Sequence, residues 1–470
     1  MTAAAPPVAE DLGRVHFVGI GGAGMSGIAR ILLARGLPVS GSDAKDSKTL
    51  PALAALGATV HVGHDASHLN DADTVVVSTA IRATNPEVVE AHARGLRVLR
   101  RAEALASVMA GRRGVAIAGT HGKTTTTSML TVALQRAGAD PSFAIGGDLN
   151  EPGSNAHHGS GELFIAEADE SDGSFLLLNP EVGVVTNVEA DHLDHYGSAA
   201  AVDEAFISFA QTIQPGGFLV ACADDPGART VADVGRREGL RVITYGQSAE
   251  ADVRVTEVEL SGPTTRWSLS RDGDSLQTVE LAVPGLHNVL NSAAALTTAL
   301  ELGFALPPLL EGLATFHGAR RRFEPKGTAA GVRVFDDYAH HPTEVTATLR
   351  AARDVAGSGR VIVAFQPHLY SRTQAFATQF GEALGLADAV VVMDVYAARE
   401  DPVPGITGAL VASAVTGADE VIFEPSWSAV AGRLAALAQP GDVVLTLGAG
   451  DVTMVGPEVV AALAERELQT

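Results

Sequence analysis

The sequence is poor in cysteine and in basic residues, and each shortage excludes a class of protein. Cys222 is the single cysteine, so the chain has neither a disulfide framework nor a cysteine-based zinc site. Basic residues number 33 against 55 acidic ones, and the net charge of −22 would repel nucleic acid and anionic membrane. We therefore expect no nucleic-acid partner, and a negatively charged substrate would need local basic groups.

Long apolar runs are also missing. No stretch reaches about 18 uninterrupted apolar residues, which argues against a membrane span and membrane insertion. The segment MTAAAPPVAED has no basic region followed by an apolar run, so no signal peptide is expected. With 470 residues, 46% of them hydrophobic and 19% charged, the sequence predicts a cytoplasmic globular protein of several domains. The oligomeric state does not follow from the sequence.

The most informative segment is GTHGKTTTT, residues 119–127. It follows an apolar run, 114–118, and precedes a helix-like segment, 128–136. A strand, a glycine turn and a helix in this order bind phosphate, because the turn N–H groups and the positive end of the helix dipole face the anion. The generic P-loop has a further glycine where this chain has Ile117, so the turn is a shortened variant. It predicts an ATP site made by Gly119, Thr120, His121, Gly122, Lys123, Thr124 and Thr125.

Two side chains of this turn have separate expected tasks. Lys123 supplies a positive charge for the terminal phosphates, and the Thr124 hydroxyl supplies a ligand for Mg²⁺. A surface turn rich in small residues is the alternative interpretation. The preceding strand and the lysine–threonine pair favour ATP.

A second glycine turn lies near the start of the chain. A predicted strand, 15–18, leads into GIGGAG, and a helix is expected over 25–35. Gly19, Gly21 and Gly24 match the dinucleotide fingerprint, and Asp43 lies 19 residues beyond Gly24, where an acid would bind a ribose hydroxyl. Any nucleotide diphosphate can use such a turn, so NAD remains an alternative ligand.

The first hundred residues alternate strands and helices. Strand-like runs at 37–42, 59–62, 73–80 and 96–100 predict a parallel sheet with helices on its faces. Ligands gather at strand ends in such sheets. His64, Ser78, Thr79 and Ala80 lie at such ends, although each could be ordinary surface. A break near 110–114 indicates that the first domain covers 1–110.

Acidic residues follow the next two predicted strands. The run 163–166 leads into EADESD, and the run 182–186 leads into NVEADHLDH. These strands deliver carboxylates and a histidine to the same sheet edge as the phosphate turn, which suits Mg²⁺. Glu167 and His192 are the best ligand candidates, with Glu170 as the alternative to Glu167. A solvated acidic loop is the competing interpretation.

The rest of the central region predicts strands at 217–221 and 241–245, and a loop over 135–161. Residues 252–283 alternate apolar and polar side chains, which favours an antiparallel part. Asn288 and Asn291 lie three residues apart on one expected helical face, where they could cap the helix or bind a purine edge. The basic cluster 320–322 marks the end of a central domain, 111–322.

The last third, 323–470, resumes the strand–helix alternation. The predicted strand 332–335 leads into DDYAHHPTE, and the predicted strand 360–365 leads into QPHLYSRT, with further strands at 389–395 and 442–447. Histidines and an arginine at strand ends are placed to meet ligands in the crevice of an open α/β sheet. Two such clusters after consecutive strands favour a functional site.

Seven segments together resemble the Mur ligases. GIGGAGM, GTHGKTTTT, EADESDGSF, NVEADHLDHY, GLHNVLN, DDYAHHPTEV and FQPHLYSRT occur in the order found in that family and span nearly the whole chain. The resemblance is strongest to the branch that adds L-alanine to UDP-N-acetylmuramate. It implies three α/β domains: an N-terminal Rossmann-like domain for the UDP sugar, a central P-loop domain for ATP, and a C-terminal Rossmann-like domain.

The resemblance also implies roles for individual residues. The family's metal positions correspond to Glu167 and His192, its transferring-phosphate position to Arg322, and its ribose position to Asp337. Asn288 and Asn291 correspond to the adenine contacts. The UDP-sugar diphosphate would be held by Gly19, Ile20, Gly21, Gly22, Ala23, Gly24 and Met25, and the amino acid by Tyr338, His340, His368 and Arg372.

Two positions depart from patterns common among these ligases. An arginine often follows the proline of the FQPH segment by two residues, and Leu369 occupies that position here. Several sibling ligases have a carbamylated lysine that holds a second Mg²⁺, whereas Ile207 lies near that position and the four lysines of this chain lie elsewhere. The L-alanine-adding branch also lacks this lysine, so its absence supports that assignment.

The resemblance implies an ATP-dependent ligase of peptidoglycan precursor synthesis. The muramoyl carboxylate would be activated by phosphoryl transfer from ATP, and the alanine amine would attack the acyl phosphate. An NAD-dependent oxidoreductase, suggested by the first turn, and a nucleotide-regulated protein that hydrolyses ATP without ligation are the alternatives.

Overall fold

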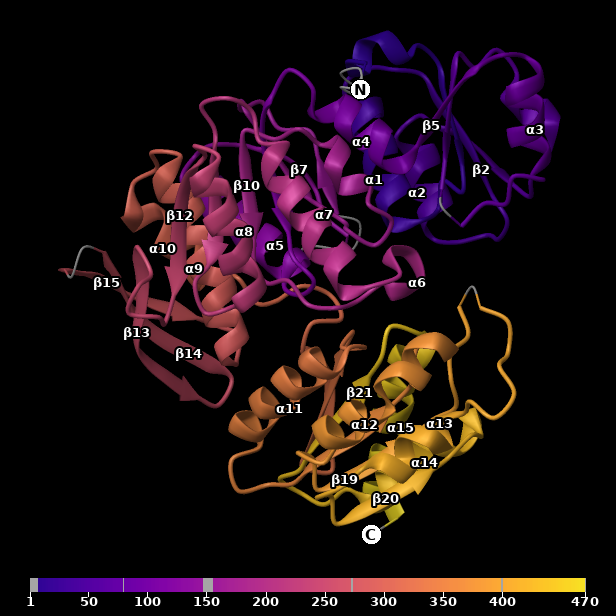
Figure 1. Ribbon diagram of the computed structural model, residues 1–470. Coiled ribbons are helices and arrows are strands. Elements are labelled where there is room, and N and C mark those ends of the chain that lie inside the picture. The colour runs from indigo at the N-terminus through magenta and orange to yellow at the C-terminus, as the bar shows by residue number, and fades with distance from the viewer. Residues whose placement is uncertain (1–6, 79, 147–154, 272–273, 399, 470) are drawn as a thin grey trace. The chain divides into compact units, whose positions relative to one another are not determined.

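The computed structural model describes residues 7–78, 80–146, 155–271, 274–398 and 400–469. These residues form three sheets, each built from its own stretch of the chain (Figure 1). Contacts within the chain divide these residues into two compact bodies. One body runs to Thr256 and adds Leu269–Gln277 and Leu290–Thr315, whereas the other comprises Glu257–Ser268, Thr278–Val289 and Phe316–Thr470.

The N-terminal sheet is parallel, with the strand order β3-β2-β1-β4-β5. The order reverses between β1 and β4, and ligands bind at such a reversal in open α/β sheets. The turn 19–22 after β1 and Ser78 after β4 therefore lie at the expected binding edge. The strands are β1 Val15–Val18, β2 Val39–Asp43, β3 Thr59–Val62, β4 Thr74–Val77 and β5 Arg97–Arg100, and the helices are η1 Ala9–Leu12, α1 Ala23–Ala34, α2 Thr49–Ala55, η2 Ala66–Leu69, α3 Pro86–Ala93 and α4 Arg101–Met109.

The central sheet has the strand order β15-β14-β13-β12-β11-β10-β6-β9-β7-β8. The strand β6 (Arg113–Ala118) pairs in parallel with β10 on one side and β9 on the other, so its end lies between theirs. The following strands are β7 Ser142–Ala144, β8 Ala156–His157, β9 Leu163–Glu167, β10 Val182–Val185, β11 Phe218–Cys222, β12 Arg241–Gly246, β13 Val253–Ser261, β14 Thr264–Arg271 and β15 Asp274–Leu281. The helices are α5 Lys123–Arg136, η3 Ser174–Leu177, α6 Leu193–Tyr196, α7 Ala199–Gln211, α8 Pro226–Arg237, α9 Leu286–Glu301 and α10 Leu306–Ala314.

Two parts of the central region depart from parallel pairing. The strands β13 and β14 are joined by residues 262–263 alone, a connection that only antiparallel neighbours allow, as the alternating pattern predicts. The predicted loop 135–161 is wrong in part, because β7 and β8 lie within it and pair antiparallel. These strands are too short to show a periodic apolar pattern.

The C-terminal sheet has the order β16-β17-β21-β18-β19-β20, and β16 with β17 is its antiparallel pair. Both faces of this sheet are covered, because alternate side chains of β18 pack into two different hydrophobic cores. Val361, Val363 and Phe365 pack with α11 and α12, whereas Ile362 and Ala364 pack with α14 and α15. The strands are β16 Glu324–Ala329, β17 Val332–Asp337, β18 Val361–Phe365, β19 Ala389–Val392, β20 Glu420–Phe423 and β21 Val443–Leu447, and the helices are α11 Pro342–Ala356, α12 Tyr370–Leu384, α13 Gly408–Ala414, α14 Trp427–Leu437, η4 Asp451–Met454 and α15 Val455–Gln469.

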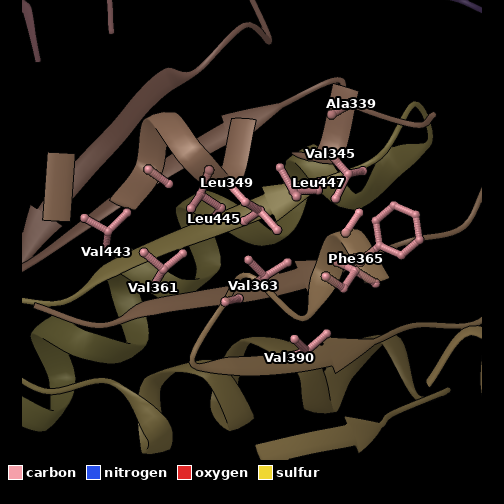
Figure 2. Close-up of a cluster of buried hydrophobic side chains, with 14 of the residues drawn as sticks. Ala339, Val345, Leu349, Val361, Val363, Phe365, Val390, Val443, Leu445 and Leu447 are labelled. Atoms are coloured by element: carbon pink, nitrogen blue, oxygen red, sulfur yellow. The ribbon is translucent and has the colours of Figure 1, made fainter. Parts of the chain in front are cut away.

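The first of these two cores fixes the position of the strand ends that carry polar residues. Figure 2 shows Val361, Val363 and Phe365 of β18 beside Leu445 of β21 and Leu349 of α11, all of them buried. Such a close-packed core resists displacement of its strands. The residues after β17, β18 and β21 are therefore held at one edge. No helix among the described residues has the length and apolar character needed to cross a membrane.

Candidate functional site

The first glycine turn is shaped by close contacts to the neighbouring strand ends. The N–H groups of Gly19 and Ile20 both donate to the carbonyl oxygen of Ser42, at 2.8 and 3.0 Å. The Gly21 N–H donates to Asp43 Oδ2 at 2.9 Å, and a side chain at Gly21 would meet that carboxylate. Gly19 has φ +87°, which favours glycine. The helix α1 begins at Ala23, so Gly24 and Met25 belong to its first turn.

The other predicted UDP-sugar residues are brought near this turn to different degrees. A Cβ on Gly19 would lie 3.2 Å from Ser78 Cβ, and the Ala80 N–H donates to Ser78 Oγ. The His64 ring lies 2.9 Å from Ser42 Oγ through Nδ1. Thr79 lies outside the described residues. The described members of the predicted set thus collect at the reversal point of the N-terminal sheet.

The second glycine turn is held by the residues that follow β10. Thr120 N donates to the Asn187 carbonyl oxygen at 3.1 Å, and His121 N donates to Asn187 Oδ1 at 2.8 Å. Thr186 Oγ1 donates to the His121 carbonyl oxygen at 2.6 Å. Gly122 has φ +82°, which favours glycine. Sequence interpretation did not assign Thr186 and Asn187, because their contact to the turn depends on the pairing of β6 with β10.

Lys123 is folded back onto its own turn. Its Nζ donates to the carbonyl oxygens of Gly119 and Thr120, at 2.6 and 3.1 Å, and to Glu170 Oε1 at 2.8 Å. Burial favours the neutral amine, but the neighbouring carboxylates, Glu170 foremost, outweigh burial and raise the pKa of Lys123. The turn therefore holds a buried ammonium group before any phosphate binds.

The predicted metal residues lie around this lysine. Glu170 is almost fully buried, with its Oε2 2.7 Å from Lys123 Nζ. His192 Nε2 lies 3.6 Å from Glu170 Oε1. Glu167 ends β9 and accepts a hydrogen bond from Gly146 N at 2.8 Å. Thr124 is buried in the first turn of α5, where Thr125 lies next to it.

This donor set fits a hard divalent cation. It combines carboxylate and hydroxyl oxygens with one imidazole, beside a turn suited to phosphate, and Mg²⁺ prefers such oxygen ligands. Glu170 already neutralises Lys123, whereas the described partner of Glu167 is a backbone N–H. Glu167 is therefore easier to recruit as a ligand than Glu170.

The two predicted adenine residues lie on α9 with different partners. Asn288 Nδ2 donates to the Pro284 carbonyl oxygen at 2.8 Å, near the start of the helix. Asn291 Oδ1 accepts from Thr126 Oγ1 at 3.2 Å, and a Cβ on Gly122 would lie 2.5 Å from this oxygen. Asn291 therefore contacts the phosphate turn itself, a role that the sequence did not indicate.

Aromatic and charged residues gather at one edge of the C-terminal sheet. The rings of His340 and His368 lie edge to face, 5.9 Å apart, and Arg372 Nη1 is 3.3 Å from His368 Nδ1. The Arg322 guanidinium lies over the Tyr338 ring, 5.3 Å from its centroid. All five residues were predicted from the sequence, and the structure brings them together.

Glu344 joins these groups and was missed by the sequence analysis. One of its carboxylate oxygens lies 3.6 Å from Arg322 Nη1, and the other accepts from the backbone N–H of His340 at 3.0 Å. It is the third residue of α11, three positions after the cap His341. Its place in a capping box is the signal that could have drawn attention to it.

Two further positions qualify the sequence predictions. Asp337 is buried and accepts backbone hydrogen bonds from Phe323 and Ala339, both 2.8 Å long. Burial raises the pKa of Asp337 to about 6, against the opposing effect of Arg322. Leu369, which replaces the arginine common in related ligases, is buried, and its N–H donates to the Tyr396 carbonyl oxygen at 2.9 Å.

The fold and these sites define a multidomain α/β protein with two glycine turns at strand–helix junctions and a third sheet whose edge carries histidine and arginine side chains. Family models match along the chain: the Mur ligase catalytic domain over 14–113, the Mur ligase middle domain over 117–299, and the Mur ligase glutamate ligase domain over 321–450. The chain belongs to the Mur ligase family.

Individual relatives cover nearly the full length. UDP-N-acetylmuramate–L-alanine ligases from Acidothermus cellulolyticus and Kineococcus radiotolerans are each 61% identical. The first match covers 97% of this chain and 96% of the relative, and the second covers 99% of both. The crystal structure of UDP-N-acetylmuramate–alanine ligase from Thermotoga maritima is 29% identical, has a TM-score of 0.80, and is matched over 97% of this chain and 99% of that one.

Proposed function

We propose that this chain is an ATP-dependent ligase that joins L-alanine to the carboxyl group of UDP-N-acetylmuramate. The observation that carries the proposal is the full-length identity of 61% to relatives named for this activity. The proposed site of action is the cytoplasm, in peptidoglycan precursor synthesis. The limits 1–110, 111–322 and 323–470 for the three domains remain a prediction.

At the proposed ATP site, the second glycine turn receives the phosphates. The N–H groups at the start of α5 favour an anion, and the buried Lys123 adds a full charge. The γ-phosphate would replace Glu170 as the partner of Lys123. Asn288 and Asn291 are the proposed adenine contacts, and Asp337 is the proposed ribose contact.

Thr124, Glu167 and His192 are the proposed residues that would hold Mg²⁺. The ion, when bound, would neutralise charge that develops on the transferring phosphoryl group. His192 has φ +54°, in the left-handed region, so its backbone conformation is an unusual one for a histidine. Residues held in this way cluster at functional sites, which supports its assignment.

The UDP sugar is assigned to the first glycine turn. The N–H groups of residues 23–25, at the start of α1, would face the diphosphate, and Asp43 would accept from the ribose. His64 and residues 78–80 complete the proposed site. No lysine or arginine lies among residues 19–25, but Arg101 lies beside Gly24, where it pairs with Asp169 at 2.8 Å.

Tyr338, His340, His368 and Arg372 would bind the amino acid, and Arg322 would stabilise the transferring phosphate. The substrate carboxylate attacks the γ-phosphorus, and ADP leaves. The amine of L-alanine then attacks the acyl carbon, loses a proton and expels inorganic phosphate, which forms the amide. Water must be excluded, because the acyl phosphate would otherwise be hydrolysed.

The test is a coupled phosphate-release assay with UDP-N-acetylmuramate, ATP and each amino acid in turn. We expect release to depend on the sugar nucleotide and to be stimulated most by L-alanine. Phosphate release that no amino acid stimulates would support the ATP-hydrolysing alternative. Binding of NADH with a change in its fluorescence would support the oxidoreductase alternative.

The intermediate has its own test. Substrate labelled with ¹⁸O in the muramoyl carboxyl group should yield labelled inorganic phosphate, because one carboxyl oxygen leaves with the phosphoryl group. Unlabelled phosphate from a reaction that forms amide would overturn the acyl-phosphate mechanism and leave the ligase assignment in place.

A further inference from the structure

A buried carboxylate lies beneath the first glycine turn. Glu87, in the first turn of α3, is fully buried, and Asn85 caps that helix by accepting from Glu87 N at 2.9 Å. An acid in the first turn suits the helix dipole. Burial of its whole side chain is costly unless other groups compensate the charge, so the surroundings of Glu87 are informative.

Three histidines and a serine surround this carboxylate. Ser42 Oγ donates to Glu87 Oε2 at 2.6 Å, and His64 Nδ1 lies 3.2 Å from the same oxygen. His68 Nδ1 lies 2.9 Å from Oε1, and His16 Nε2 lies 3.7 Å from it. These groups come from β1, β2, η2 and the segment after β3, so Glu87 connects several strand ends of the N-terminal domain.

The charge of Glu87 decides which nitrogen of His64 carries a proton. Burial opposes ionisation, but the nearby His16 ring and the hydrogen bonds with Ser42 and His68 outweigh it and hold the pKa of Glu87 at about 2. An ionised carboxylate can only accept hydrogen bonds. His64 Nδ1 must therefore be the donor in its contact with Glu87, and Nε2 is the ring nitrogen left for another partner.

Ser42 connects this cluster with the glycine turn. Its carbonyl oxygen accepts from the N–H groups of Gly19 and Ile20, while its hydroxyl donates to Glu87 and lies 2.9 Å from His64 Nδ1. His64 retains 16% side-chain exposure above a carboxylate that has none. One residue thus supports both the phosphate-binding turn and the imidazole beside it.

We propose that Glu87 is a positioning residue of the UDP-sugar site, which fixes His64 with Nδ1 protonated so that Nε2 accepts a hydrogen bond from a hydroxyl or N–H group of the uridine nucleotide. This inference rests on the proposed function of the first turn. With its Nδ1–H on Glu87, the His64 ring presents the lone pair of Nε2, which can accept from a ribose hydroxyl or the uracil N–H and cannot donate to a phosphate oxygen.

The test measures binding of UDP by titration calorimetry to the wild-type chain, Glu87→Gln, His64→Ala and the double variant. Each single variant should weaken UDP binding about 5-fold, the scale of one hydrogen bond between neutral groups. The double variant should be no weaker than His64→Ala. Glu90→Gln is the matched control, because Glu90 lies on the same helix, is 37% exposed and pairs with Arg94.

A spectroscopic measurement separates positioning from general stability. Long-range ¹H–¹⁵N correlation spectra should show His64 protonated at Nδ1 in the wild type and in Glu90→Gln, and a loss of this exclusive state in Glu87→Gln. ATP binding should be unchanged in all variants that fold. If Glu87→Gln does not fold, Ser42→Ala, which keeps the carboxylate, should still weaken UDP binding by about 3-fold.

Two results would overturn the proposal. One is UDP binding by Glu87→Gln that equals the wild type. The other is a loss of UDP affinity from Glu87→Gln that is equally large when His64 has already been replaced by alanine. Failure of the wild type to bind UDP at all would instead remove the proposed sugar site, so the two assignments fail by different measurements.

Discussion

The two glycine turns of this chain solve the problem of binding phosphate in different ways. The first turn, after β1, has no basic residue among residues 19–25, and an acid, Asp43, accepts from one of its N–H groups. The second turn, after β6, contains Lys123, whose buried ammonium group is neutralised by Glu170. The first turn has N–H groups and, beside Gly24, an arginine that is paired with Asp169, whereas the second has a lysine within the turn itself.

This difference matches two tasks. A group that only holds a diphosphate needs directional N–H donors, which a glycine turn and a helix start provide. A phosphoryl group in transfer develops charge that must be compensated in place, and a preorganised lysine does this without reorganisation. The comparison therefore supports the proposed retention of the UDP sugar at the first turn and the proposed phosphoryl transfer at the second.

Removal of the lysine should have the largest effect. Lys123→Ala should lower the rate of amide formation at saturating ATP by at least ~100-fold, the scale of losing one electrostatic stabiliser. The affinity for UDP should not change, because Lys123 belongs to the second turn and UDP is proposed to bind at the first. Arg136→Ala is the matched control: Arg136 ends the same helix, is exposed and pairs with Glu311. More than half of wild-type turnover in Lys123→Ala would remove the phosphate role.

The metal prediction concerns Glu167 and Glu170, the acids that lie beside the second turn. Glu167→Ala should raise the Mg²⁺ concentration for half-maximal activity by about 10-fold, as loss of a ligand contact does. UDP affinity should stay unchanged. Glu181→Ala is the control, because Glu181 pairs with Arg113 ahead of β10, outside this group of acids. A Mg²⁺ titration that shifts for Glu170→Ala and not for Glu167→Ala would transfer the ligand role to Glu170.

The converse prediction concerns the acid of the first turn. Asp43→Ala should weaken UDP binding by several-fold to about 10-fold, because it removes the acceptor expected for the ribose and the partner of Gly21 N. The Michaelis constant for ATP should remain at its wild-type value. Asp46→Ala, an exposed acid in the same segment, serves as the control. Equal losses of UDP and ATP binding in Asp43→Ala would break the division of tasks between the turns.

Local patterns in the sequence were sufficient to predict the α/β fold and the position of both turns. A strand, glycines and a helix follow one another within about fifteen residues, so their signal does not depend on distant pairing. The strand β3 was predicted with its observed limits, 59–62. The helix α5 begins at Lys123 rather than at residue 128, because threonines have only moderate helix propensity and conceal its first turn.

Contacts between distant segments could not be predicted in the same way. Thr186 and Asn187 support the second turn from a strand end more than sixty residues away, and Asn291 reaches it from α9. The sequence analysis assigned no role to Glu87, because its histidine partners are spread over three other segments. Such sites become visible only when the sheet order is known.

The smallest effect concerns the charge buried beneath the first turn. With the pKa of Glu87 held at about 2, below its ordinary value of 4.5, the folded state binds this proton less readily than the unfolded chain. The resulting stability is fully present above pH 4.5 and is lost as the pH falls toward 2. Between pH 5 and pH 4 the loss from this one group should be about 0.7 kcal/mol.

The measurement is the free energy of opening of the N-terminal domain, from hydrogen exchange of amides in β2 and α3 at pH 5 and pH 4. Other carboxylates contribute equally to the wild type and to Glu87→Gln, so the difference between the two proteins isolates Glu87. The wild type should lose more stability than the variant over this interval, while amides of β6 and α5 should show no such difference. If the free energy of opening in β2 and α3 has the same pH dependence in both proteins, Glu87 is not held ionised by its neighbours. The contrast between a charge beneath the first turn and a charge within the second would then disappear.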